Sequence, residues 1–217
     1  MLIYKGQSGF CSGVQNAIDI ALENKVDRKE IYTLGNIIHN QRVVKGLEGV
    51  GILPINDIKS LNKKDLIVIC SHGKDKLTID TLINKGVKVV DGTCPFVKRI
   101  HEKVYNYSLD GYNIVIVGDE NHTEVKGIAG WCMNNCQIIK NEKEMDFLAG
   151  EKFLVVCQTT FPVYNYQLIK KNLKKIGDKL SKIVVFFDSI CYTTDKRQKE
   201  ADIIAEKFDL MLVLGDV

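Results

Sequence analysis

The 217-residue chain lacks the features that mark membrane, fibrous or nucleotide-binding proteins. No apolar run reaches the roughly 18 residues that a membrane-spanning helix needs, and the N-terminus lacks the charged-then-apolar order of a signal peptide. It has only three prolines and no low-complexity tract, which argues against long disordered linkers. Neither G-x-x-x-x-G-K-[ST] nor G-x-G-x-x-G occurs, which disfavours a nucleotide ligand. These absences predict a soluble, cytoplasmic, globular protein.

A strong excess of charge is also missing, since 30 basic and 27 acidic residues leave a net charge of +3. This mild excess does not suggest nucleic acid, although it fits a small anionic ligand where positive charge is focused. A hydrophobic content of 45% is typical of a chain with a real core. Seven cysteines, an odd number, favour metal or redox chemistry over a disulfide framework in a reducing compartment.

What the chain does contain is an alternation of strand-like and helix-like segments. Short apolar runs such as residues 66–70 and 153–157 end in small polar turns, and helical stripes such as Val97, Ile100 and Val104 lie between such runs. This alternation predicts an α/β fold with mostly parallel sheets. Further strands are expected at residues 1–8 and 210–214.

Three cysteines mark an internal repeat. Each follows an expected strand, precedes an expected helix and is followed 24 residues later by glycine: Cys11 with Gly35, Cys94 with Gly118, Cys191 with Gly215. Counting 28 residues from the first two reaches His39 and His122, and the same count from the third passes the last residue. The agreement indicates repeated α/β units. We expect them at residues 1–92, 93–188 and 189–217, facing one centre, with the third incomplete.

The three repeat cysteines predict a metal or cluster site. Ligands of parallel sheets bind beyond the carboxyl ends of the strands, so the thiols should share one side. Thiolates from distant segments suit an iron–sulfur cluster better than zinc, whose ligands often include a closely spaced cysteine pair. Three thiolates would leave one iron of a cubane available as a Lewis acid. Zinc binding, disulfides and simple burial remain alternatives. The helix N-terminus should lower the pKa of the Cys94 thiol.

Polar residues follow the same strand ends. We expect His39, His72, His122 and Thr159 at this rim, where histidines and backbone N–H groups suit a phosphate or diphosphate. The alternative for each histidine is an ordinary core or surface position. Glu124 should have a raised pKa near a cluster and a diphosphate, which suits a proton donor. Its alternative is a solvated loop residue.

The remaining cysteines are expected to be structural. Cys70 and Cys157 end apolar strands and should be packed in the core. Cys132 and Cys136 form C-x₃-C without a third cysteine nearby, which is a weak metal signal.

Seven segments together carry a family resemblance. They are GFCSGV at 9–14, IHN at 38–40, SHG at 71–73, DGTCP at 91–95, HTEVKG at 122–127, QTT at 158–160, and DSICY at 188–192 with Arg197 and Gln198. In this order they resemble the 4-hydroxy-3-methylbut-2-enyl diphosphate reductase family. The resemblance implies a trefoil of α/β units around a [4Fe–4S] cluster held by Cys11, Cys94 and Cys191. It also implies reductive removal of an allylic hydroxyl, giving isopentenyl and dimethylallyl diphosphates.

The resemblance implies roles for the polar residues as well. Glu124 would serve a proton relay, His39, His72 and His122 would border the substrate, and Thr159 would order water. Electrons would come from ferredoxin or flavodoxin. The family continues beyond residue 216 into a Ser-x-Asn segment, so the chain is expected to be a fragment with poor turnover. The alternatives are another [4Fe–4S] hydro-lyase and a non-catalytic zinc or redox module.

Overall fold

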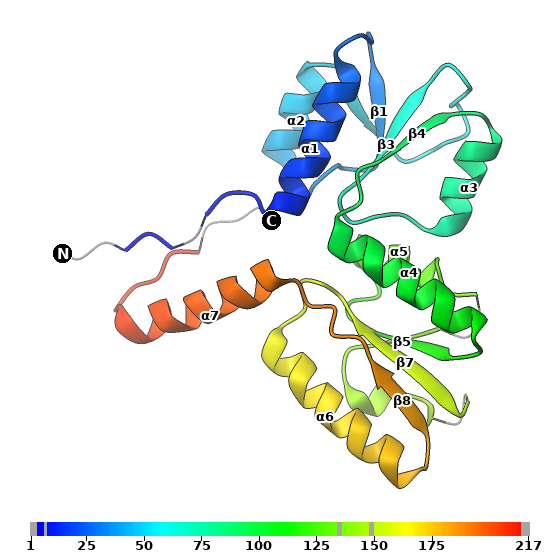
Figure 1. Ribbon diagram of the computed structural model, residues 1–217. Coiled ribbons are helices and arrows are strands. Elements are labelled where there is room, and N and C mark those ends of the chain that lie inside the picture. Colours follow the sequence, from blue (N-terminus) through cyan, green and yellow to red (C-terminus); the bar gives the residue numbers. More distant parts are fainter. Residues whose placement is uncertain (1–3, 7, 134–135, 148–149, 214–217) are drawn as a thin grey trace.

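The computed structural model describes residues 4–6, 8–133, 136–147 and 150–213. Figure 1 shows two α/β units and a last helix that projects from them. The first unit contains, in chain order, α1 Ser12–Lys25, β1 Ile31–Leu34, α2 Gln41–Gly49, β2 Ile52–Ile55, β3 Leu66–Ile69, α3 Lys76–Asn84 and β4 Lys88–Asp91. Its sheet has the order β2-β1-β3-β4, and all three strand pairs are parallel.

The second unit repeats the first. It contains α4 Pro95–Leu109, β5 Asn113–Val117, α5 Thr123–Ala129, β6 Cys136–Ile139, the short 3₁₀ helix η1 Glu142–Glu144, β7 Lys152–Cys157, α6 Val163–Lys179 and β8 Ile183–Phe186. Its sheet order β6-β5-β7-β8 matches the first sheet strand for strand and is again parallel. The predicted α/β fold with repeated units and parallel sheets is therefore confirmed.

Both sheets are covered on two faces, which explains their continuous apolar strands. In the second sheet, Val115 and Val155 face a core shared with Tyr166 and Leu173 of α6. The alternate residues of the same strands, Ile114, Ile116, Leu154 and Val156, face Ile100 and Val104 of α4 on the other side. Because successive side chains of a strand point to opposite faces of the sheet, the same strands contribute residues to both cores. Loops at the strand ends are left to carry polar residues.

The strand register corrects one detail of the predicted repeat. Leu34 and Val117 end equivalent strands, and continuing the β1–β3 register places Ile69 opposite Leu34, while Cys157 lies opposite Val117. Ile69, rather than Cys70, is therefore the counterpart of Cys157. From the sequence alone, Cys70 and Cys157 are predicted to close equivalent strands; this prediction is wrong by one residue, although both thiols are buried, as predicted. Ser71 is in consequence the counterpart of Thr159.

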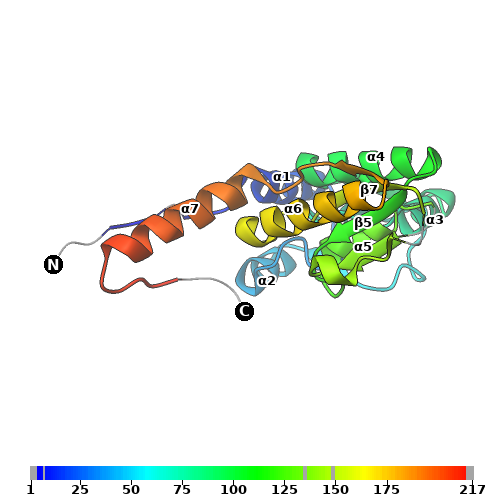
Figure 2. The same ribbon diagram turned by 90° about the horizontal axis from the view of Figure 1, so that it is seen from below.

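The last described helix, α7 Tyr192–Lys207, follows the second sheet and carries no buried residue. The chain start lies along it: the Tyr4 ring stacks on Phe208 at 5.9 Å between centroids, and the Tyr4 hydroxyl donates to Glu200 at 3.3 Å. Figure 2 shows that α7 extends away from the two sheets.

The strands predicted at 1–8 and 210–214 are wrong for the residues described. Residues 4–6, 8 and 210–213 form no strand, whereas 1–3, 7 and 214 lie outside the described residues. A strand needs a partner for its backbone groups, and the described residues include no third sheet. Leu210, Leu212 and Val213 are at least three-quarters exposed in consequence. None of the described helices is long and apolar enough to cross a membrane.

Candidate active site

The three repeat cysteines occupy the same position in their units. Cys11, Cys94 and Cys191 are the N-cap residues of α1, α4 and α7. Their carbonyl oxygens accept hydrogen bonds from the residues four positions later, at 3.0, 2.9 and 3.1 Å. None of the three side chains caps its helix, and all three thiols are half-buried. Each unit therefore presents a thiol that its own helix does not use.

Gly13 brings the first unit against the second cysteine. A β-carbon built on Gly13 would lie 2.5 Å from Cys94 Sγ, which is closer than real side chains approach. Only glycine lets the first turn of α1 lie against this thiol. The Cys94 thiol also feels the charges of Cys11 and Cys191, both of which act to raise its pKa. The three thiols therefore share one electrostatic environment.

The predicted lowering of the Cys94 pKa is wrong. Burial is the largest influence and raises the pKa of this thiol, outweighing the nearby N–H groups of Phe96 and Val97. The N–H groups of a helix N-terminus lower the pKa of a thiol most effectively where the thiolate is also solvated by water or lies next to a cation.

The donor set fits an iron–sulfur cluster. In the part of the chain that is described, no group of three or more His, Cys, Asp or Glu side chains is arranged to hold a single metal ion. The three thiols nevertheless come from the starts of three different helices and are not used as helix caps. Cys94 Sγ lies where Gly13 leaves room, and the charges of Cys11 and Cys191 act on it. Cysteine thiolates are the ligands of iron–sulfur clusters.

The three histidines predicted at the rim lie together. The ring centroid of His39 lies 5.5 Å from that of His72 and 5.3 Å from that of His122. Burial and the charges of its neighbours lower the pKa of His72 from 6.5 to about 3, and burial also lowers the pKa of His122. Both rings are therefore neutral near pH 7. The Nδ1 atom of His72 is buried without a hydrogen-bond partner, so this ring can still bind a ligand.

Glu124 lies beside the histidines and is held by Thr159. The carboxylate accepts from the Thr159 backbone N–H and from its hydroxyl, both at 2.6 Å. Both residues are buried, at 4% and 6% exposure. Burial raises the pKa of Glu124 even though the two hydrogen bonds act to lower it. Its own N–H donates to His122 Nδ1 at 3.1 Å. The carboxyl group thus connects the histidines with the end of β7.

Backbone contacts tie these residues to the cysteines. The Thr159 carbonyl accepts from the Cys191 N–H at 3.0 Å, and the Ser71 carbonyl accepts from the Cys94 N–H at 2.9 Å. Ser71 and Thr159 are equivalent in the repeat, so the two units hold their cysteines in the same way. His72 follows Ser71 directly. Of the polar residues predicted for the rim, His72 and Thr159 therefore lie in or next to a segment that positions a cysteine.

His101 and Trp131 form a support under the His72 loop that we did not predict. The rings stack at 5.2 Å between centroids, and Trp131 Nε1 donates to the Lys74 carbonyl at 2.9 Å. A β-carbon on Gly73, whose φ is +76°, would lie 2.5 Å from His101 Cε1. One signal was present in the sequence: His101 lies four residues after Val97, on the buried stripe of its helix.

The support should make the protein acid-sensitive. Burial lowers the pKa of His101 from 6.5 to about 4, so the unfolded chain takes up a proton at higher pH than the folded chain. Stability is therefore present above pH 6.5 and is lost as the pH falls towards 4; His72 adds to this loss. For His101 the loss corresponds to roughly 3 kcal/mol. Urea unfolding near neutral pH and at about pH 4 measures it.

Two variants separate His101 from the other histidines. His101→Asn should be less stable near pH 7, because the stack on Trp131 is lost, but its stability should fall less on acidification. His39→Asn changes an exposed ring and removes one of the charges that lower the pKa of His72, so it should reduce only the contribution of His72 and keep the fall that His101 causes. An equal fall in His101→Asn and the unmodified chain would contradict the assignment.

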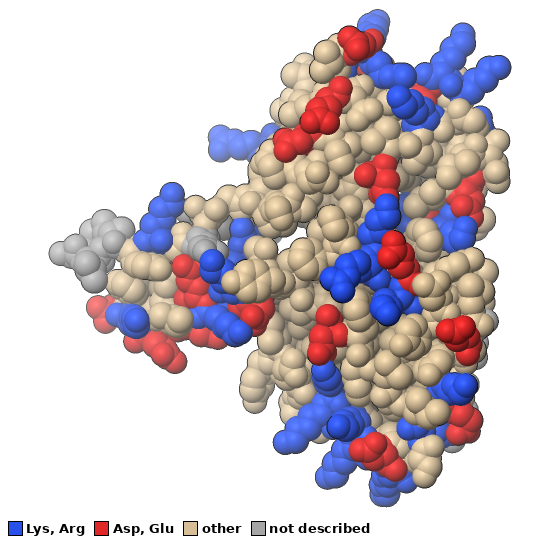
Figure 3. Space-filling view, viewed as in Figure 1, with Lys and Arg blue, Asp and Glu red and all other residues tan. Residues whose placement is uncertain are grey.

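Positive charge gathers close to Cys94. Figure 3 shows Lys and Arg side chains over α4 in the middle of one face. This helix carries Lys98, Arg99 and Lys103, all exposed, and Lys98 pairs with Asp91 at 2.8 Å. The guanidinium of Arg99 and the ammonium of Lys103 each lie 6.0 Å from the Phe187 ring centroid. Three basic side chains, with the acidic Asp91 and Glu102 near them, thus lie on the helix that Cys94 begins.

Comparison with known proteins places the chain in a family. A family model described as LytB protein matches residues 2–217. The chain is 43% identical over 213 residues to a 4-hydroxy-3-methylbut-2-enyl diphosphate reductase of Caldanaerobacter subterraneus, covering 96% of this chain and 73% of the relative. A Clostridium acetobutylicum relative of the same name is 42% identical over 213 residues, covering 96% of this chain but 33% of the longer protein.

Solved structures agree. The E-1-hydroxy-2-methyl-but-2-enyl-4-diphosphate reductase of Plasmodium falciparum superposes with a TM-score of 0.84 at 30% identity, over 92% of this chain and 63% of that chain. A second structure, described as the terminal enzyme of the non-mevalonate pathway, gives a TM-score of 0.74 at 32% identity, over 93% and 72%. The family model covers almost the whole chain, and the relatives share both its sequence and its fold. The chain therefore belongs to the LytB protein family.

Proposed function

We propose that the chain is a 4-hydroxy-3-methylbut-2-enyl diphosphate reductase, an oxidoreductase that removes an allylic hydroxyl and forms isopentenyl and dimethylallyl diphosphates. The observation that carries this proposal is the equivalent placement of Cys11, Cys94 and Cys191 at the starts of three helices. The repeat supports units at 1–92, 93–188 and 189–217. Seven free cysteines support a reducing, cytoplasmic location.

We assign Cys11, Cys94 and Cys191 as the residues that would hold a [4Fe–4S] cluster. When bound, this group supplies electrons and a Lewis acid for the allylic hydroxyl. The protein contributes a half-buried setting and the N–H groups at the starts of α1, α4 and α7. Three ligands instead of four distinguish such a site from the usual four-cysteine arrangement.

The surrounding residues fit substrate binding and proton supply. His39, His72 and His122 can donate ring N–H bonds to a diphosphate and to the leaving hydroxyl. Burial raises the pKa of Glu124, so this carboxyl can hold a proton to a higher pH than an exposed carboxyl and release it within the site. Thr159 keeps both carboxylate oxygens in place through its N–H and its hydroxyl. Loss of a hydroxyl as water needs such a proton.

The proposed electron donor is a ferredoxin or a flavodoxin. The exposed Lys98, Arg99 and Lys103 on the helix that Cys94 begins give a positive surface for an acidic partner. Charge of this kind mainly increases the rate of encounter and depends on ionic strength. Turnover with such a donor should therefore decrease as salt is added, whereas turnover with a small neutral reductant should not.

The test of the cluster ligands is Cys94→Ser, with Cys70→Ser as the matched control. Anaerobic reconstitution of the unmodified chain should give iron and sulfide in equal amounts, about four of each, with broad absorbance near roughly 410 nm. Cys94→Ser should lose most of the iron because a thiolate ligand is removed. Cys70→Ser changes a buried thiol that donates to the Leu34 carbonyl at 3.0 Å, and should keep the iron.

The outcome also separates the remaining alternatives. Zinc in place of iron, or full iron in Cys94→Ser, would overturn the proposed function. A [4Fe–4S] hydro-lyase would convert the substrate without consuming reductant, so oxidation of reduced methyl viologen in step with substrate loss supports the reductase instead.

A further inference from the structure

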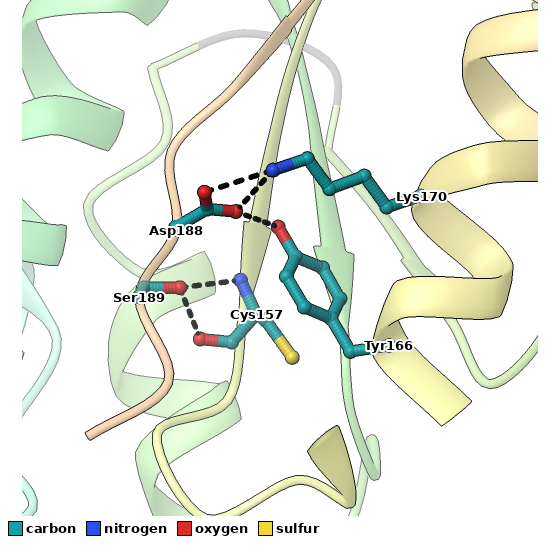
Figure 4. Close-up of polar contacts among 5 residues, drawn as sticks. All are labelled: Cys157, Tyr166, Lys170, Asp188 and Ser189. Atoms are coloured by element: carbon teal, nitrogen blue, oxygen red, sulfur yellow. Dashed lines mark hydrogen bonds and ion pairs between the residues drawn. The ribbon is translucent and has the colours of Figure 1, made fainter. Parts of the chain in front are cut away.

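The hydroxyl of Ser189, two residues before Cys191, both accepts and donates a hydrogen bond. Its Oγ accepts from the Cys157 N–H at 2.7 Å and donates to the Cys157 carbonyl at 2.6 Å. Figure 4 shows the Ser189 side chain pointing to the Cys157 backbone at the end of β7. Ser189 is 6% exposed, so water cannot take over these bonds. One hydroxyl therefore satisfies two buried backbone groups.

The equivalent junction in the first unit is built differently. Gly92, two residues before Cys94, donates its own N–H to the Ile69 carbonyl at 3.1 Å. A β-carbon on Gly92 would lie 2.4 Å from the same oxygen, so the two backbones are in direct contact. Ile69 and Cys157 are equivalent in the strand register. In the second sheet the hydroxyl of Ser189 thus takes the place of a main-chain bond and keeps the two backbones further apart.

The position of Ser189 determines the position of Cys191. The Cys191 N–H donates to the Thr159 carbonyl at 3.0 Å, two residues beyond Cys157. Thr159 in turn donates its N–H to Glu124 at 2.6 Å. Two successive contacts therefore join the same two chain segments: Ser189 with Cys157, and Cys191 with Thr159. If the Ser189–Cys157 contact became shorter, the Cys191–Thr159 contact would shift with it. Both the Cys191 thiol and Thr159, the partner of the Glu124 carboxylate, would then move.

Asp188 fixes the same segment from the other side. Lys170 of α6 binds both carboxylate oxygens at 2.6 and 2.8 Å, and the Tyr166 hydroxyl donates to one of them at 3.4 Å. In Figure 4, Asp188 points toward Lys170 and Tyr166. With Asp188 held at α6, Ser189 is the adjustable contact that sets the distance to β7.

We propose that Ser189 is a positioning residue for Cys191: its hydroxyl spaces residues 189–191 from the end of β7 so that the Cys191 thiol and Thr159 lie correctly for the site. The proposal rests on the proposed function for what the thiol binds. It also states something about the chain alone, because the thiol should be displaced before any iron is added.

The experiment compares Ser189→Ala, Ser189→Thr and Ser108→Ala. Ser108 is a matched control, since its buried hydroxyl also donates to one backbone carbonyl, Tyr105 at 2.8 Å, and accepts from one N–H, Met133 at 3.1 Å. It lies at the end of α4, away from the cysteine at its start. Both alanine variants should lower the melting temperature, so stability alone does not separate them.

Two readouts do separate them. After anaerobic reconstitution, a ferrous chelator should remove iron from Ser189→Ala roughly 10- to 100-fold faster than from the unmodified chain, the usual effect of losing a contact that orients a ligand. Ser108→Ala and Ser189→Thr should release iron at the parent rate. In the iron-free chain, Ser189→Ala should change the alkylation rate of Cys191 relative to Cys11, measured by peptide mass spectrometry.

The possible failures are distinct. If the unmodified chain binds no iron, the proposed function is wrong, and the alkylation ratio still tests the role of Ser189. If the unmodified chain binds iron and Ser189→Ala releases it no faster than Ser108→Ala, the positioning role is wrong while the proposed function stands.

Discussion

Gly13→Ala should abolish stable iron binding while leaving a folded protein. The added methyl group would lie 2.5 Å from Cys94 Sγ and 3.2 Å from Cys94 Cβ, so either the thiol or the first turn of α1 must move. Overpacking of this kind costs about 1–3 kcal/mol, which a domain of this size tolerates. A displaced thiolate is no longer a ligand. Iron and sulfide content after anaerobic reconstitution measures the loss, and urea unfolding measures the cost to stability.

Gly46→Ala is the matched control for this change. Gly46 lies in α2, and no atom lies within 4 Å of a β-carbon built there. Alanine in a helix interior is favoured over glycine by up to about 1 kcal/mol, so this variant should be as stable as the parent or slightly more stable. It should also bind iron normally. Full iron content in Gly13→Ala would show that Cys94 does not need its place against α1.

Glu124→Gln should reduce turnover by at least about 100-fold, the usual contribution of a positioned acid or base. Glutamine keeps the shape of the side chain. Its carbonyl oxygen can accept from the Thr159 N–H, and its NH₂ can donate to the Thr159 hydroxyl, so both contacts at 2.6 Å have a replacement. What is lost is the transferable proton. Oxidation of reduced methyl viologen by the reconstituted chain, with substrate, measures the rate.

The pH dependence of stability provides a second readout for Glu124. Burial raises its pKa above the ordinary 4.5, so the folded chain holds the proton to a higher pH than the unfolded chain. The group therefore contributes stability at low pH that is lost as the pH rises through the raised pKa. Glu124→Gln should remove this component. Glu120→Gln, a change at an exposed residue of the loop before α5, should change neither the rate nor the pH dependence.

Local patterns in the sequence were sufficient for much of the fold and the site. The apolar runs at residues 66–70 and 153–157 contain strands β3 and β7, and the 24-residue spacing located three helix starts. Strand β2 was missed because Pro54 interrupts its pattern. Proline is tolerated there since β2 is at the edge of its sheet. Which strand lies at an edge is a property of the assembled sheet.

Features that depend on two distant segments were not predictable in this way. The contact of Gly13 with Cys94 joins two units, and no pattern within either unit indicates it. The same holds for the support of the His72 loop by Trp131. The sign of the Cys94 pKa change was wrong for a related reason: the helix N-terminus is visible in the sequence, whereas burial by neighbouring units is not.

The packing of the chain start on α7 has a consequence for the order in which the protein folds during synthesis. The Tyr4–Glu200 contact spans 196 positions, whereas both four-stranded sheets are built from contiguous stretches of chain. Closing so long a loop is entropically costly and must wait until α7 has left the ribosome. The two sheets can form before that, with Cys11 and Cys94 already in place. Cys191 is therefore the last of the three thiols to arrive, and a cofactor that needs all three can be inserted only after the segment that begins α7 has been made.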